Sequence, residues 1–276
     1  MARQNRAGES RKSKKRPSRS KASPRPPVQQ EADVLERGDI FFFYRPGTQS
    51  PTPGSLLEVN RFHVVLRPED GERLRYLTIG KKKLPGDGQD GRHWGFVAGV
   101  FEQPEDLRNV LLVAGESNDT GNGSRTAAVP AGEGIYALVR KARNTVLAYA
   151  LELPEQPGEV QREFNIVPRG HFTLTIKNPE VPSPEGIGLD DDRKAAFPEE
   201  LQERFGSRKW IGADPPAFLD YEGTEFLLIA GDERVEEAEI ELTPEPEDES
   251  SAEIFHGLDL EPSERAIKPL FEGTWA

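Results

Sequence analysis

The run Ile40-Phe41-Phe42-Phe43-Tyr44 is the feature that most limits how this chain can fold. Side chains of a β-strand alternate between the two faces of a sheet, so a strand with this sequence is apolar on both faces. A strand of that kind is stable only where both of its faces are covered. The run therefore predicts an interior strand.

Other segments carry the alternation and turn signals of strands, and proline marks the start of short helices. Together they predict an α+β fold with a predominantly antiparallel β-sheet and about three short helices. The expected strands are a hairpin at 61–85 across Asp70-Gly71, a strand at 93–101, a hairpin at 134–154 turning near Arg143-Asn144, and strands at 171–179 and 224–231; the expected helices start near Pro104, Pro157 and Pro198.

Composition divides the chain into four parts. We expect a disordered basic arm at 1–30, a β-rich first half at 31–115, an α+β second half at 124–231, and an acidic segment with an apolar C-terminal peptide at 232–276. The Gly- and Asn-rich stretch at 115–124 is the expected boundary between the halves. The region around 243–252 has so few apolar residues that it is also expected to be disordered.

The basic arm has a charge opposite to that of the rest of the chain. Residues 1–30 hold ten Lys and Arg against one acid, a charge of +9; the other residues hold 26 basic and 47 acidic side chains, a charge of −21. Such an arm is typical of contact with nucleic acid or another polyanion. The alternatives are a solvated tail, one that binds the chain's own acidic segment, and a targeting signal. The expected contact residues are Arg11, Lys12, Lys14, Lys15, Arg16, Arg19 and Lys21.

Several chemistries have no residues to support them. The chain has no cysteine, which excludes disulfides, thiolate zinc sites and thiol nucleophiles. Its four histidines lie on separate segments without the spacing of a zinc site, and no phosphate-binding loop or serine nucleophile motif occurs. We therefore expect no metal, no cofactor and no assignable catalytic residue. No apolar stretch is long enough to span a membrane and no secretory signal is present, so no membrane partner and a cytoplasmic location are expected.

One cluster is a candidate binding site. If the second strand of the 61–85 hairpin pairs with the strand at 93–101, a group of cationic side chains and an indole gathers at one loop end, a combination that suits a phosphate or a base. The alternative is a solvated turn with a partly buried tryptophan. The cluster comprises Lys81, Lys82, Lys83, Arg92, His93 and Trp94.

The apolar residues in 254–275 are too many for a solvated tail. They predict either that the segment docks on the body of the chain or that it binds a protein partner. The leading functional hypothesis is a non-enzymatic cytoplasmic binding or adaptor protein whose basic arm contacts nucleic acid or another polyanion. The alternatives are a hydrolase-like enzyme without a recognisable motif and a structural or assembly protein with tails of opposite charge.

Overall fold

The structure, a computed structural model, describes residues 33–69, 73–86, 91–112, 115–116, 124–183, 188–231, 241–262 and 267–275. The chain divides into two units, residues 1–31 and 32–276, and all the described residues belong to the second. The basic arm and its seven predicted contact residues lie outside the described residues.

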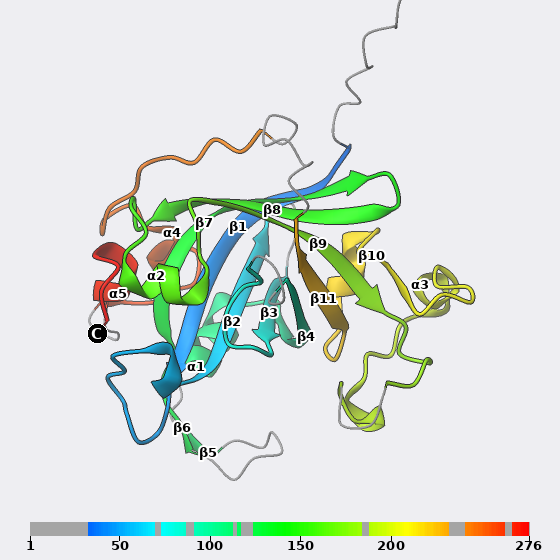
Figure 1. Ribbon diagram of the computed structural model, residues 1–276, viewed down its shortest axis with the longest axis horizontal. Helices are drawn as coiled ribbons and strands as arrows, with labels where there is room; N and C mark the ends of the chain where they lie inside the picture. The colour runs from blue at the N-terminus through cyan, green and yellow to red at the C-terminus, as the bar shows by residue number, and fades with distance from the viewer. Residues whose placement is uncertain are drawn as a thin grey trace, which may run out of the picture. The chain divides into compact units, whose positions relative to one another are not determined.

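Eight antiparallel strands close into a β-barrel (Figure 1), so the predicted α+β fold class is wrong. Around the barrel the order is β9-β11-β4-β3-β2-β1-β7-β8, and β8 pairs again with β9. The strands are β1 (Asp33–Pro46), β2 (Val59–Pro68), β3 (Leu74–Ile79), β4 (Arg92–Phe101), β7 (Val129–Lys141), β8 (Asn144–Leu153), β9 (Arg169–Lys177) and β11 (Glu225–Ala230).

Three shorter strands and several short helices accompany the barrel. β10 (Trp210–Gly212) pairs with β9, and β5 (Gly115–Glu116) pairs with β6 (Ser124–Arg125) in a separate ribbon. The described part of the chain contains no helix long and apolar enough to cross a membrane. The α-helices are α1 (Pro104–Leu112), α2 (Glu159–Phe164), α3 (Glu199–Glu203), α4 (Glu253–His256) and α5 (Lys268–Phe271); the 3-10 helices are η1 (Leu56–Glu58), η3 (Asp191–Arg193) and η4 (Pro216–Asp220).

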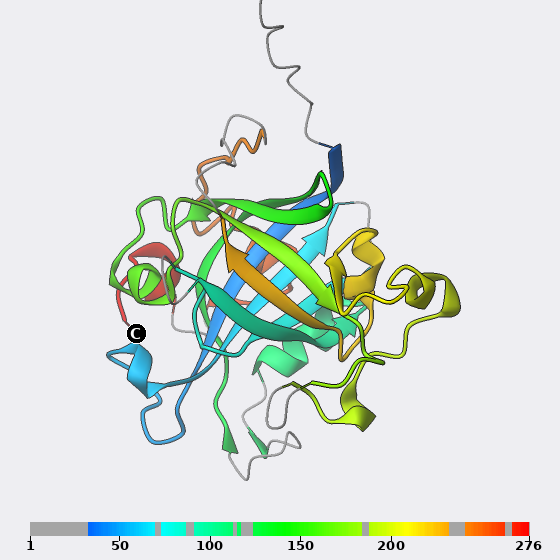
Figure 2. The same ribbon diagram turned by 45° about the vertical axis from the view of Figure 1, so that its right-hand side comes forward.

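The barrel closes through pairs between segments that are far apart in sequence. Leu147 on β8 faces Phe172 on β9, and Leu228 on β11 faces His93 on β4. In Figure 2 the strands β9 (yellow-green) and β11 (orange) cross in front of β1 (blue) and β2 (cyan). The same closed sheet therefore holds strands from both sides of the 115–124 stretch.

The predicted interior strand is confirmed, and its two faces belong to different apolar clusters. Ile40, Phe42 and Tyr44 point into the barrel, where they pack with side chains from all eight strands. Phe41 and Phe43 point outward into a second cluster. A barrel of eight strands has an interior just wide enough to be filled by side chains.

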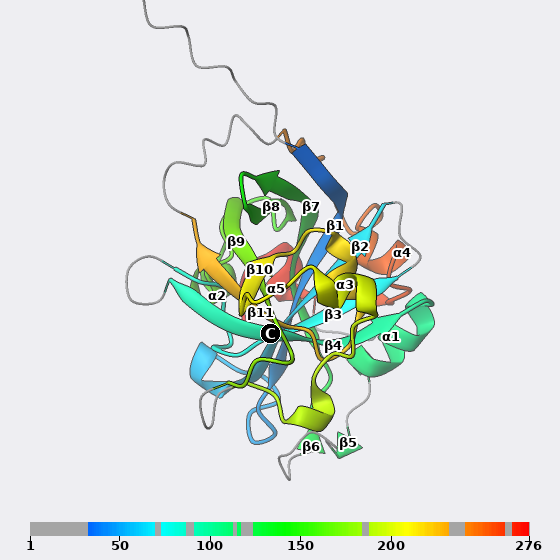
Figure 3. The ribbon, with the colours of Figure 1, turned by 90° about the vertical axis from the view of Figure 1, so that its right-hand side faces the viewer.

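The outward-facing cluster is covered by α1 and by the C-terminal segment. Ile254, Leu258 and Leu270 are completely buried against Phe41 and its neighbours, which confirms the predicted docking. Figure 3 shows α1 and α4 on the same side of the barrel, beside β2 and β3. The apolar side chains that a recognition peptide would present to a partner are thus buried against the barrel of the same chain.

Around residues 243–252, where the sequence predicts disorder, the acidic segment contacts the barrel. Residues 241–248 form neither helix nor strand, and a turn follows at 249–251. The Glu245 N–H donates to Glu152 on β8 at 2.8 Å, and the side chain of Leu242 is buried. Low apolar content favours disorder where no other contacts offset the entropy lost on ordering. Here polar contacts to the barrel offset that loss and hold the segment. Residues 232–240 lie outside the described residues.

Candidate functional site

The cluster predicted at the loop end lies on the turn after β3 and on the first residues of β4. The Nδ1 atom of His93 lies 2.7 Å from the carbonyl oxygen of Lys83, so the structure brings these two segments together. His93 is completely buried, and the Lys82 ammonium group donates to the carbonyl of Val59 at 2.7 Å. These contacts hold part of the cluster within the fold. Lys81 and Arg92 are its exposed members.

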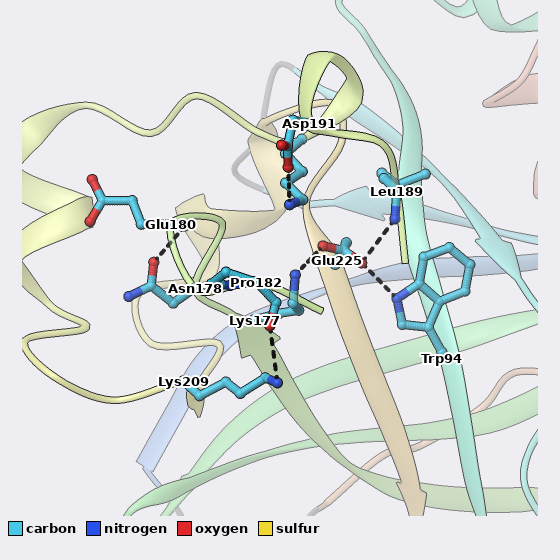
Figure 4. A network of polar contacts seen from close by, with 10 residues as sticks. Trp94, Lys177, Asn178, Glu180, Pro182, Leu189, Asp191, Lys209 and Glu225 are labelled. Carbon is cyan, nitrogen blue, oxygen red and sulfur yellow. Dashed lines mark hydrogen bonds and ion pairs between the residues drawn. The ribbon is translucent and has the colours of Figure 1, made fainter. Parts of the chain in front are cut away.

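Trp94, the sixth member, belongs to a buried polar network on the outer face of the barrel. Lys177 at the end of β9 and Glu225 at the start of β11 form an ion pair of 2.6 Å, and each side chain is 2% exposed. The other oxygen of Glu225 accepts hydrogen bonds from the Trp94 indole and from the Leu189 N–H, each at 3.2 Å (Figure 4). Both charges are therefore paired and hydrogen-bonded, as burial requires.

The same network fixes the segment that begins at residue 188. Gly188 has a φ of +97°, and a Cβ atom there would lie 2.4 Å from a Glu225 oxygen. Only glycine combines that backbone conformation with so close an approach. Lys177 and Glu225 are shielded from solvent and paired with each other. We therefore interpret this network as a structural one that holds the segment beginning at residue 188 on the barrel.

The lumen of the barrel is filled. A void of about 10 Å³ lies among its apolar side chains, including Phe42, Leu77, Tyr149 and Leu228. That is at the lower limit for a single water molecule. The lumen therefore has no room for a ligand, and a candidate site has to lie at an end or on the outside.

One end of the barrel is closed by a layer of charged and polar side chains. Arg75 on β3 donates to both oxygens of Glu36 on β1, at 2.6 and 3.0 Å, and to Asp220 of η4 at 2.7 Å. The Tyr136 hydroxyl on β7 donates to Glu36 at 2.7 Å. Arg75 is only 4% exposed, so this layer is an ion cluster withdrawn from water.

The protonation states in this layer follow from burial and charge. Burial, together with the charge of Glu36, raises the pKa of Tyr136 well above its ordinary value, so the phenol remains a donor. Burial alone would lower the pKa of Arg75, but the charge and hydrogen bonds of Glu36, together with the charge of Asp220, outweigh it and raise that pKa. The guanidinium is therefore a permanent cation.

A pocket of about 560 Å³ lies against this layer. Its charged lining adds two arginines, Arg37 of β1 and Arg73 just before β3, to the layer. Arg37 donates one hydrogen bond to the Glu241 carbonyl at 3.0 Å, and Arg73 is exposed. The remaining walls are apolar or proline: Leu35, Pro68, Pro215, Pro216 and Ala217.

Sequence reasoning missed this pocket. Arg73 and Arg75 are separated by one residue at the start of a strand, which is typical of a solvent-facing edge. The usable signal was that Arg75 shares a face with the apolar Leu77 and Ile79, which predicts burial. No local pattern, however, links that face to Glu36 or to Asp220.

Comparisons with protein-family models, with curated proteins and with solved structures gave no match to this chain.

Proposed function

We propose that this chain is a non-enzymatic cytoplasmic binding or adaptor protein whose arm, residues 1–30, binds nucleic acid or another polyanion. The single observation that carries the proposal is the separation of charge along the sequence, +9 in the arm against −21 in the remainder. Cations on a short arm attract phosphates and release their counterions. The acidic body is repelled by the same polyanion, so contact is confined to the arm.

The barrel supports a binding role through what it offers as a scaffold. Its lumen is filled by side chains, so it does not serve as a carrier that encloses an apolar ligand. Its eight-stranded sheet is closed, and closure removes the exposed sheet edges that promote unspecific pairing with other chains. A stable body of this kind can position an arm without itself contacting the polyanion.

A second candidate function rests on the acidic segment. Residues 232–264 hold fourteen acids and one arginine, a charge opposite to that of the arm. The arm could pair with this segment within one molecule or between copies, which would make the chain an assembly component. Exposed pairs of this kind are weak singly and strongly screened by salt.

The two candidates differ in whether the arm is available in the whole protein. Fluorescence anisotropy with a labelled single-stranded oligonucleotide at low salt would compare the full chain, residues 31–276 and the isolated peptide 1–30. Polyanion binding predicts that the full chain and the peptide bind, while residues 31–276 do not. Binding by the peptide but not by the full chain would show that the arm is occupied, which favours assembly. Equal binding by residues 31–276 and the full chain would refute both.

A further inference from the structure

We propose that the pocket at the end of the barrel, between β1, β3 and η4, binds a small organic anion with a carboxylate or phosphate head. This proposal is independent of the arm and rests on the pocket's lining, volume and charge. Ligand sites in proteins are typically concave, 300–1,000 Å³ in volume, and occur in the mouths of barrels. The volume of about 560 Å³ falls within that range.

The charge of the lining favours an anion over a cation. The carboxylates of Glu36 and Asp220 are both bound to the Arg75 guanidinium, and Glu36 also accepts the Tyr136 hydroxyl proton. The one guanidinium balances half of their negative charge, so the layer alone carries a charge of −1. Arg37 and Arg73 add two positive charges to the lining of the pocket. Three arginines against two carboxylates give the lining a charge of +1 in a body whose overall charge is strongly negative.

The two outer arginines have the donors that an anionic head requires. A guanidinium carries five N–H donors, and in Arg37 one of its nitrogens donates to the Glu241 carbonyl. Arg73 lines the same pocket and is exposed to solvent. Arginine binds carboxylates and phosphates through two parallel hydrogen bonds. The pair can therefore hold either head group.

The rest of the lining determines what is attached to that head. Leu35, Pro68, Pro215 and Pro216 form walls without hydrogen-bond donors, apart from backbone groups. Contact with such walls favours an apolar or aromatic body over a sugar or a polyamine. The ligand class is accordingly an organic acid or organic phosphate with a compact apolar part.

The buried layer acts as a positioning element for the pocket. Arg75 joins β1 through Glu36 and η4 through Asp220, so the two walls are fixed relative to each other in the absence of ligand. A pocket that is already formed does not have to be ordered when the ligand binds, and this lowers the entropic cost of binding.

Isothermal titration calorimetry on the full chain tests the proposal with benzoate and phenyl phosphate as probes and neutral benzamide as the comparison. We expect both anions to bind and benzamide to bind more weakly. Arg73→Gln and Arg37→Gln should each weaken the anions roughly tenfold. Arg61→Gln removes the same charge from an exposed residue of β2 that does not line the pocket, so it should leave both affinities unchanged.

Three outcomes would overturn the proposal. They are the absence of anion binding at millimolar concentration, equal affinity for benzoate and benzamide, and an equal loss of affinity in Arg61→Gln and Arg73→Gln. The basic arm also attracts phosphate, but it is unchanged in these variants, so binding at the arm predicts no effect of Arg73→Gln. Circular dichroism would verify that the variants are folded. Because Arg73 is exposed, its replacement should not disturb the barrel.

Discussion

Replacing Glu133 with glutamine is expected to remove the pH dependence of stability between pH 7 and 9. Glu133 lies on β7 beneath the C-terminal segment and is 1% exposed. Its two oxygens accept hydrogen bonds from the Glu253 and Ile254 N–H groups, at 2.9 and 3.0 Å. Burial, together with a hydrogen bond and charge from Glu247, raises the pKa of Glu133 to about 10.

The other charged groups around Glu133 are mainly acidic. Asp39 on β1 and Glu253 both pair with Arg67 on β2, at 2.7 and 2.5 Å. Burial also raises the pKa of Glu152 on β8, to about 7. The acidic segment therefore contacts the barrel at the carboxyl group of Glu133, which keeps its proton at neutral pH. Glu152 contributes to the pH dependence mainly below about pH 8, so most of the change between pH 7 and pH 9 belongs to Glu133.

The magnitude follows from the two protonation states. Between the unfolded pKa of 4.5 and the folded value of about 10, the folded chain keeps a proton that the unfolded chain has lost. Stability therefore falls as pH rises, by up to about 1.4 kcal/mol per pH unit for one proton. From pH 7 to pH 9 the native chain should lose up to about 3 kcal/mol. Glutamine at 133 cannot ionise, although it loses one acceptor, at a cost of about 1 kcal/mol.

Urea unfolding at pH 7 and pH 9 measures this difference directly. Relative to the native chain, Glu133→Gln should gain stability as pH rises, whereas Glu249→Gln, at an exposed position of the acidic segment, should follow the native chain. If Glu133→Gln and the native chain lose the same stability between the two pH values, Glu133 is ionised throughout and the reasoning fails.

Two further predictions concern the packing on the barrel. A chain ending at Ser250 should melt at a lower temperature and bind a hydrophobic dye, because Ile254, Leu258 and Leu270 are completely buried and each contributes about 1.5–3 kcal/mol; an unchanged melting curve would show that the segment adds no stability. Glu225→Gln should lower the free energy of unfolding by about 3–5 kcal/mol in urea, because it leaves the charge of Lys177 buried without its partner. The exposed Glu222→Gln is the matched control, and an equally small effect in both variants would contradict the role of the ion pair.

The strands were predictable because their signals are local. Alternation and turn residues gave the β2–β3 and β7–β8 hairpins, which the structure pairs as Leu66 with Arg75 and Tyr136 with Tyr149. The turn at Asp70-Gly71 itself lies outside the described residues. Barrel closure was not predictable, since it depends on pairs such as Phe96 with Glu225, which no local pattern connects.

The buried polar network and the helices α4 and α5 could not be predicted from the sequence for a similar reason. Lys177 and Glu225 each lie at a strand end, where a charge is normally solvated, and only the tertiary fold buries them together. The helices α4 and α5 are four residues long, too short to be stable without packing, so their sequences carry little helical signal. The loop-end prediction identified segments that do meet, and the contacts between them include the buried His93 ring on the Lys83 carbonyl and the Gly80 N–H on the Trp94 carbonyl.

The measurement that tests the proposed function most directly is the salt dependence of oligonucleotide binding by the full chain and by residues 31–276. If about five of the ten cations in the arm contact phosphates, log K should fall against log salt with a slope of roughly −3.5 to −4.5. Removing residues 1–30 should abolish both the binding and its salt dependence. Binding with a slope near zero, or an unchanged slope after the arm is removed, would contradict the proposal that the basic arm is what this protein uses to bind a polyanion.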